Sequence, residues 1–167
     1  MKRTQSLAAH ALLAIARQRA GFDAERCRLV LEHFDTCAML HAAIHRTLAP
    51  HRLSELQFGV LVVLFSLEPD PIGAADLAVH TAVSRSAITE ALDNLEAQKL
   101  VTRTRDTHDR RVIYVRLSAA GRALAEPATL EFLRTVQAVT RFLDDSAQQQ
   151  VLAGYARLQE GAANFSA

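Results

Sequence analysis

The sequence predicts a mainly α-helical protein with a small β-hairpin, and three observations carry this prediction. Alanine and leucine together supply 53 of the 167 residues, and both favour helices. Only 6 glycines and 4 prolines are present, whereas a β-sandwich or barrel needs many turns. Near residue 100 the apolar residues change from helical spacing to alternating, β-branched runs. Because half of the residues are apolar, residues 1–167 are expected to form one domain with apolar surface left over for an interface.

Two helices are expected in residues 1–50. Apolar residues at helical spacing begin at Leu7, and Gly21 ends the first helix after about four turns. Asp23 is placed to cap a second helix that runs from about Ala24 to Thr47, and Pro50 stops it. We expect these helices to serve dimerisation and to border a possible effector pocket.

Residues 53–118 carry the order of elements that defines a winged helix-turn-helix unit. Ser54 caps a helix over Glu55–Ser66, which is apolar nearly all round and is therefore expected to be buried. Two further helices follow, separated by a three-residue turn, and a two-stranded hairpin with a loose tip completes the unit. The expected bounds are Ala74–His80 and about 85–98 for these helices, and Val101–Arg105 and Val112–Leu117 for the strands. Such a unit typically binds DNA.

The helix that follows Ser84 is expected to be the one that reads DNA. Ile88, Leu92 and Leu95 form one inward stripe, so the side chains between them, including Glu90, face outward. The N-terminal end of a recognition helix enters the major groove, where hydroxyls and guanidinium groups reach phosphates and base edges. The candidates in this helix are Ser84, Arg85, Ser86 and Thr89.

The hairpin concentrates positive charge in a protein whose net charge is only +1. Five arginines stand against two aspartates between Val101 and Arg116, a local balance of +3. A basic, protruding hairpin suits the minor groove and its flanking phosphates. Asp109 is placed to hold the Arg111 guanidinium by a bidentate pair. The candidate DNA-binding residues of the hairpin are Arg103, Arg105, Asp109, Arg110 and Arg111.

Residues 119–167 are predicted to form two C-terminal dimerisation helices. Ser118 caps a helix that reaches Phe142 or Leu143, with a kink or break at Pro127. Asp144, or Ser146 with Gln149 as its capping-box partner, begins the last helix. The apolar residues of this segment exceed what a small winged lobe covers, so we expect a dimer that stays together at working concentration.

Five motifs lie in the stretch from Leu53 to Leu124: Leu53-Ser54-x-x-Gln57-Phe58-x-Val60-Leu61, Leu77-Ala78, Leu92-x-x-Leu95-Glu96-x-x-x-Leu100-Val101-x-Arg103, Asp109-Arg110-Arg111 and Leu117-Ser118-x-x-Gly121. With these motifs, the stretch resembles the MarR family of bacterial transcriptional regulators. The resemblance implies an obligate homodimer whose N- and C-terminal helices interleave, and two winged lobes that bind a palindromic operator. It also implies that Arg111 enters the minor groove with Asp109 orienting it. Two departures are that Glu90 stands where the family often has a basic residue, and Lys99 where it often has glycine.

The resemblance also suggests what the protein senses. It places a small aromatic or phenolic anion between the long N-terminal helix and the winged lobe, near His41, His45 and Phe58, with Arg46 as a partner for a carboxylate. We therefore expect a repressor that such a ligand releases from its operator.

Two alternatives stay open at the level of the sequence. His33, Cys37, His41 and His45 recur every four residues, and imidazole and thiolate are good ligands for zinc or haem iron. The second alternative is that Cys37 or Cys27 is a peroxide-sensing thiol, as in one branch of the family. The two lie about 15 Å apart along one helix, so a disulfide would have to cross the dimer.

Other function classes lack their motifs. The sequence contains no glycine-rich phosphate loop, nucleophile elbow or His-Glu-x-x-His pair, so no enzyme and no cofactor is expected. No apolar run approaches the roughly 18 residues of a membrane span, and two cysteines are too few for a disulfide framework. We therefore expect a cytoplasmic protein. A winged module that binds a protein instead of DNA is the remaining alternative.

Overall fold

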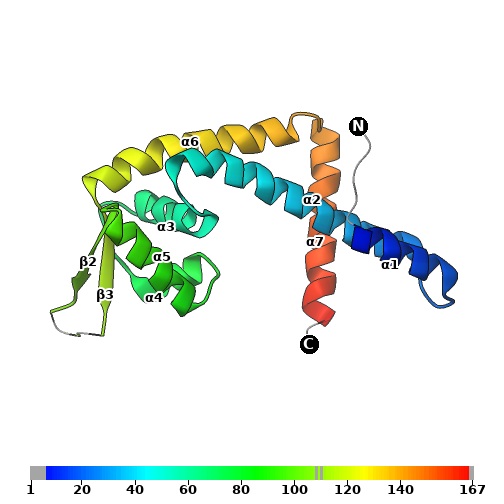
Figure 1. Ribbon diagram of the computed structural model, residues 1–167, viewed down its shortest axis with the longest axis horizontal. Coiled ribbons are helices and arrows are strands. Elements are labelled where there is room, and N and C mark those ends of the chain that lie inside the picture. The colour runs from blue at the N-terminus through cyan, green and yellow to red at the C-terminus, as the bar shows by residue number, and fades with distance from the viewer. Residues whose placement is uncertain (1–6, 108, 110, 166–167) are drawn as a thin grey trace.

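Two long helices extend along the molecule, and a small lobe lies at one end of them (Figure 1). The computed structural model describes residues 7–107, 109 and 111–165. The long helices are α2 (Ala24–Leu48) and α6 (Ala119–Thr140), which pack against each other. A 3-10 turn at Ala49–His51 leads from α2 into the lobe. The mainly helical fold with a small β-sheet confirms the predicted fold class.

The lobe has the predicted winged order. Its helices are α3 (Glu55–Ser66), α4 (Ala74–His80) and α5 (Arg85–Ala97), and the first two match the expected bounds. The hairpin consists of β2 (Val101–Arg105) and β3 (Ile113–Leu117), with Arg103 opposite Val115. A third strand, β1 (Ile72–Gly73), pairs with β3 and was not predicted, because two residues carry no periodicity. The antiparallel sheet therefore has the order β1-β3-β2.

The core of the lobe forms around α3. Val60 and Leu61 are completely buried, as expected for a helix that is apolar on all sides. Ser54 and Gln57 form a capping box at its start, each side chain bonding the backbone N–H of the other residue. The buried residues that surround α3 include Leu48, Leu77, Ile88, Leu92, Leu95, Leu100, Val101, Val115, Ala125 and Ala128.

The start of α6 fastens the long helices to the lobe. The Ser118 hydroxyl accepts from the Gly121 N–H at 2.9 Å and donates to the Lys99 carbonyl at 2.7 Å. Gly121 is packed so closely that a Cβ there would lie 1.9 Å from the Leu100 carbonyl oxygen. This contact explains the glycine of the Leu-Ser-x-x-Gly motif, because only a residue without a side chain allows the approach.

Lys99 occupies a left-handed backbone position at the end of α5, with φ of 60°. Its N–H and that of Leu100 bond the carbonyls of Glu96 and Leu95, the two bonds of a Schellman cap. Because a side chain is strained in this conformation, we expect Lys99→Gly to raise the free energy of unfolding by about 1 kcal/mol. Urea denaturation measures the change. Lys99→Ala, which keeps the Cβ, should give no such gain, and an equal gain from both variants would contradict the explanation.

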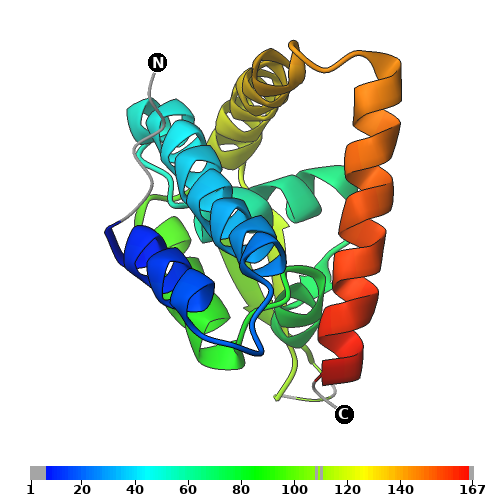
Figure 2. The ribbon, with the colours of Figure 1, turned by 90° about the vertical axis from the view of Figure 1, so that its right-hand side faces the viewer.

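The terminal helices differ in small ways from their predicted bounds. Helix α1 (Leu7–Gln18) packs against α2 and ends before Gly21, which has a φ of 91°. Helix α6 continues through Pro127, so of the predicted kink or break at this residue the break is wrong. Asp144, not Ser146, caps α7 (Asp145–Phe165) by accepting from the Ala147 N–H at 2.8 Å. Figure 2 shows α7 standing apart from most of the chain.

Candidate nucleic-acid interface

Helix α5 presents the outward face that its sequence predicts. Ile88, Leu92 and Leu95 are buried against the lobe, and Ser86, Thr89 and Glu90 are exposed. The Ser84 hydroxyl accepts from the Ala87 N–H at 3.3 Å and lies 2.9 Å from the Ser86 hydroxyl. The Thr89 hydroxyl donates to the Arg85 carbonyl at 2.9 Å. These hydroxyls are therefore held at the N-terminal end of the helix, and each still has lone pairs facing solvent.

Arg103 lies at the joint between the hairpin and α5. Its Nη2 is 2.5 Å from Asp93 Oδ1, and its Nε is 3.2 Å from Glu96 Oε2. The second contact is an ion pair without hydrogen-bond alignment, so the buried Nε has no hydrogen-bond partner. Its side chain is only 18% exposed. Arg103, predicted as a DNA contact, thus ties β2 to the helix.

The tip of the hairpin is organised by two aspartates. Asp109 Oδ1 accepts from the backbone N–H of Arg111 at 2.9 Å, and Asp106 Oδ1 accepts from the Asp109 N–H at 2.8 Å. Among the described residues, the Asp109 carboxylate does not form the expected bidentate pair with the Arg111 guanidinium. It bonds to the backbone N–H of Arg111 instead. The Arg111 side chain is exposed, as is that of Arg105. Arg110 lies outside the described residues.

Arg116 is a second arginine of the hairpin, after Arg103, that bonds to another part of the lobe. Arg116 Nη1 donates to the Pro69 carbonyl at 2.6 Å, which connects β3 to the loop after α3. Arg122 on α6 pairs with Glu68 in the same loop and lies over the Phe65 ring. Arg116 is itself exposed, but Arg105 and Arg111 are the exposed hairpin arginines whose side chains have no partner among the described residues.

The predicted effector residues lie where α2, α3 and α6 meet. His41 Nδ1 is 2.8 Å from Glu55 Oε2, which joins α2 to α3. The Phe58 ring packs on Phe132 of α6 with centroids 4.9 Å apart. His45 and Arg46 are exposed on α2. None of these four residues lines the cavities of about 220, 300, 340 and 640 Å³ that other described residues border.

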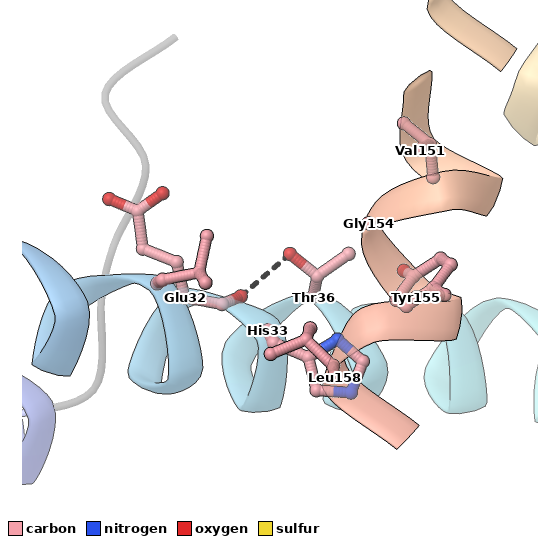
Figure 3. Close-up of a pocket in the computed structure, with 8 residues that line it drawn as sticks. Glu32, His33, Thr36, Val151, Gly154, Tyr155 and Leu158 are labelled. Atoms are coloured by element: carbon pink, nitrogen blue, oxygen red, sulfur yellow. Dashed lines mark hydrogen bonds between the residues drawn. The ribbon is translucent and has the colours of Figure 1, made fainter. Parts of the chain in front are cut away.

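The two cavities on α2 lie away from the lobe. One, of about 640 Å³, is an apolar hollow between α1 and α2, which Leu12, Phe22 and Val30 help to line. The other, of about 340 Å³, lies at the crossing of α2 and α7, where Figure 3 shows His33, Tyr155 and Leu158 close together. The His33 and Tyr155 rings meet edge to face with centroids 5.4 Å apart.

The histidine and cysteine stripe on α2 does not form a metal site. Cys37 Sγ lies 3.4 Å from His33 Nε2, but His41 turns to Glu55 instead. No group of three or more His, Cys, Asp or Glu side chains is placed to hold a metal ion among the described residues. Cys27 and Cys37 are both free thiols on one continuous helix. The stripe therefore gives no support to the metal or haem alternative.

Apolar side chains on the long helices are left uncovered. No residue of α7, all of which is described, is buried. On α2 and α6 the exposed apolar residues include Leu29, Phe34 and Met39, and Leu130, Leu133 and Val136. On α7 they include Val151, Leu152 and Phe165. In the described part of the chain, no helix is long and apolar enough to span a membrane.

Comparisons with known proteins agree with this geometry. A sequence model of the MarR family matches residues 53–112. The transcriptional repressor YetL of Bacillus subtilis is 31% identical over 111 residues, which span 66% of this chain and 66% of YetL, just under two thirds of its length. AbsC, a MarR family regulator from Streptomyces coelicolor, has a similar fold, with a TM-score of 0.74 and 22% identity over 87% of this chain and 99% of AbsC. MepR of S. aureus in complex with DNA gives a TM-score of 0.70 and 21% identity over 78% of this chain and 96% of MepR.

Proposed function

The chain belongs to the MarR family, and on that premise we propose that it is a dimeric, sequence-specific DNA-binding transcriptional regulator. The observation that carries the proposal is the pairing of an exposed α5 with a basic hairpin in one lobe. Arg85, Arg105 and Arg111 are exposed charges available to phosphates and base edges. The likeness to MepR, whose structure contains DNA, supports a nucleic-acid partner.

Each element has a distinct part in the proposed complex. Helix α5 enters the major groove with Ser84, Arg85, Ser86 and Thr89, and the hairpin reaches the adjacent minor groove with Arg105, Arg110 and Arg111. Asp109 fixes the backbone that presents Arg111. Arg103 contributes indirectly, by holding the hairpin against α5.

Selection of bound sequences from a pool of random duplex DNA tests the proposal. We expect a palindrome whose half-sites lie about one helical turn apart, or a multiple of it, because two lobes related by a two-fold axis read the same sequence. The absence of any enriched sequence would overturn the proposal and favour a winged module that binds protein.

The exposed apolar faces of α2, α6 and α7 support the homodimer. We expect Leu133→Asp and Leu152→Asp each to raise the dimer dissociation constant about 1,000-fold, since a symmetric interface loses two leucines worth about 2 kcal/mol each. Sedimentation over a range of concentrations measures this. The matched control is Val79→Asp, because Val79 is 78% exposed on α4. If the control dissociates the protein equally, or the two variants remain dimers, the interface lies elsewhere.

The proposal includes repression that a small aromatic or phenolic ligand relieves. Such a ligand would act at the junction of α2 with the lobe, where His41 and Glu55 join the two. His45 and Arg46 are exposed on the same helix, and Phe58 belongs to the adjoining core. Titration of the DNA complex with a series of benzoates and phenols tests this part. A ligand that releases DNA from the unaltered protein but not from Arg46→Ala would support it.

A further inference from the structure

Glu90 is the acidic residue of α5 that the lobe leaves unpaired. Three acids lie on the outer side of this helix, and Arg103 pairs with two of them, Asp93 and Glu96. Glu90 contributes only its backbone carbonyl, which accepts from the Asn94 amide at 3.0 Å. Within the described residues its carboxylate has no hydrogen-bond or ion-pair partner. A charged acceptor is therefore free on the surface that is proposed to meet DNA.

The position of Glu90 favours a base contact over a phosphate contact. It lies four residues after Ser86, so both side chains share one face, about 6 Å apart along the helix axis. The opposite face carries the buried Ile88 and Leu92. Glu90 thus projects from the second turn of α5, near the end that enters the groove. A carboxylate there is repelled by phosphates, so it needs a donor from a base.

Cytosine offers the donor that suits a carboxylate. In the major groove guanine presents two acceptors, thymine presents an acceptor and a methyl group, and adenine presents an amino group beside the N7 acceptor. Cytosine alone presents its N4 amino group without a neighbouring acceptor on the same base. A glutamate accepts from that amino group, whereas an arginine at the same place would donate to guanine O6 and N7.

We propose that Glu90 is a specificity-determining residue, which accepts a hydrogen bond from the N4 amino group of one cytosine in each half-site. This inference rests on the proposed DNA-binding function and adds the base that is read. Arg103 makes it workable, because it pairs with both other acids and offsets one of the two negative charges that would add to the repulsion of phosphates. A wrong base at that position leaves the carboxylate unpaired in the groove, which costs binding about tenfold.

Sequence selection with variants gives the first test. We expect the wild-type protein to require cytosine at one position of each half-site, and Glu90→Ala to lose that requirement while it keeps the rest of the motif. Glu90→Arg should require guanine at the same position. Glu126→Gln is the matched control, since Glu126 is exposed on α6 away from the lobe's outer face. An unchanged motif with Glu90→Ala overturns the inference about Glu90 alone, whereas no motif with any protein overturns the proposed function.

The second test removes the donor atom from DNA. In a duplex that carries the selected motif, the cytosine is replaced by 2-pyrimidinone, which lacks the N4 amino group. Wild-type protein should bind this duplex about tenfold more weakly than the unmodified one, and Glu90→Ala should bind the two equally. Equal binding by the wild type would overturn the inference. So would a Glu90→Ala variant that gains the same affinity for every duplex, because Glu90 would then act only by repelling phosphates.

Discussion

Replacing Arg111 with alanine is expected to weaken binding to the selected operator roughly 100-fold while the dimer stays intact. The side chain is exposed beside the hairpin tip, and its backbone is held by Asp109. A base or groove contact of an arginine is worth about 1–3 kcal/mol, and a dimer loses two of them. A fluorescence-anisotropy titration measures the affinity, and sedimentation checks the dimer.

The dependence of this affinity on salt provides a sharper readout. Each phosphate contact that is lost makes the log–log slope shallower by about 0.9, so Arg111→Ala should change the slope if the guanidinium also neutralises phosphate charge. Arg17→Ala, an exposed arginine on α1, is the matched control and should leave affinity and slope unchanged. Equal losses from Arg17→Ala and Arg111→Ala would contradict the assignment of the hairpin to DNA.

Gly121→Ala is expected to have the largest effect on the fold, lowering the free energy of unfolding by about 2–3 kcal/mol. The new Cβ would lie 1.9 Å from the Leu100 carbonyl oxygen and 2.9 Å from its carbon. Both are backbone atoms, so no side-chain rotation relieves the clash. The start of α6 would have to move away from the strand that begins the hairpin. Thermal or urea unfolding measures the loss at a fixed protein concentration.

A second glycine serves as the control for that prediction. Gly161 lies inside α7, and a Cβ there would have nothing within 4 Å. Gly161→Ala should therefore raise the free energy of unfolding by about 0.5–1 kcal/mol through helix propensity alone. If Gly121→Ala were as stable as Gly161→Ala, the packing of α6 against Leu100 would be looser than the structure indicates.

The sequence predicted most of the lobe because its signals are local. A serine cap and a capping-box glutamine fix the start of α3, and the switch to β-branched residues fixes β2. β1 escaped prediction because its pairing partner, β3, lies more than 40 residues later in the chain. A kink or a break of α6 was expected at Pro127, yet packing of the surrounding helix against α2 and α3 keeps the helix continuous.

The sequence indicated which residue types form the candidate site, but not which groups each arginine side chain contacts. The arginine count identified a basic hairpin, yet it could not distinguish Arg103 and Arg116, which bond to the lobe itself, from Arg105 and Arg111, whose side chains have no partner among the described residues. That distinction depends on which carboxylate or carbonyl lies nearby in three dimensions. The alternation along β2 could not supply it either, because Arg103 and Arg105 both share the face of the buried Val101, and only Arg103 lies near the carboxylates of α5.

The ion pairs of Arg103 have a consequence for how the protein would lose its operator. They join α5 to the hairpin, so we expect these two elements to move together. In the proposed dimer, the two lobes would be connected only through the long helices. A small change in the angle between those helices would alter the distance between the two lobes and leave the DNA-binding face of each lobe unchanged. DNA would then be released by a change in the distance between the two lobes. A molecule that binds between the long helices and separates them would not have to contact the residues that touch DNA.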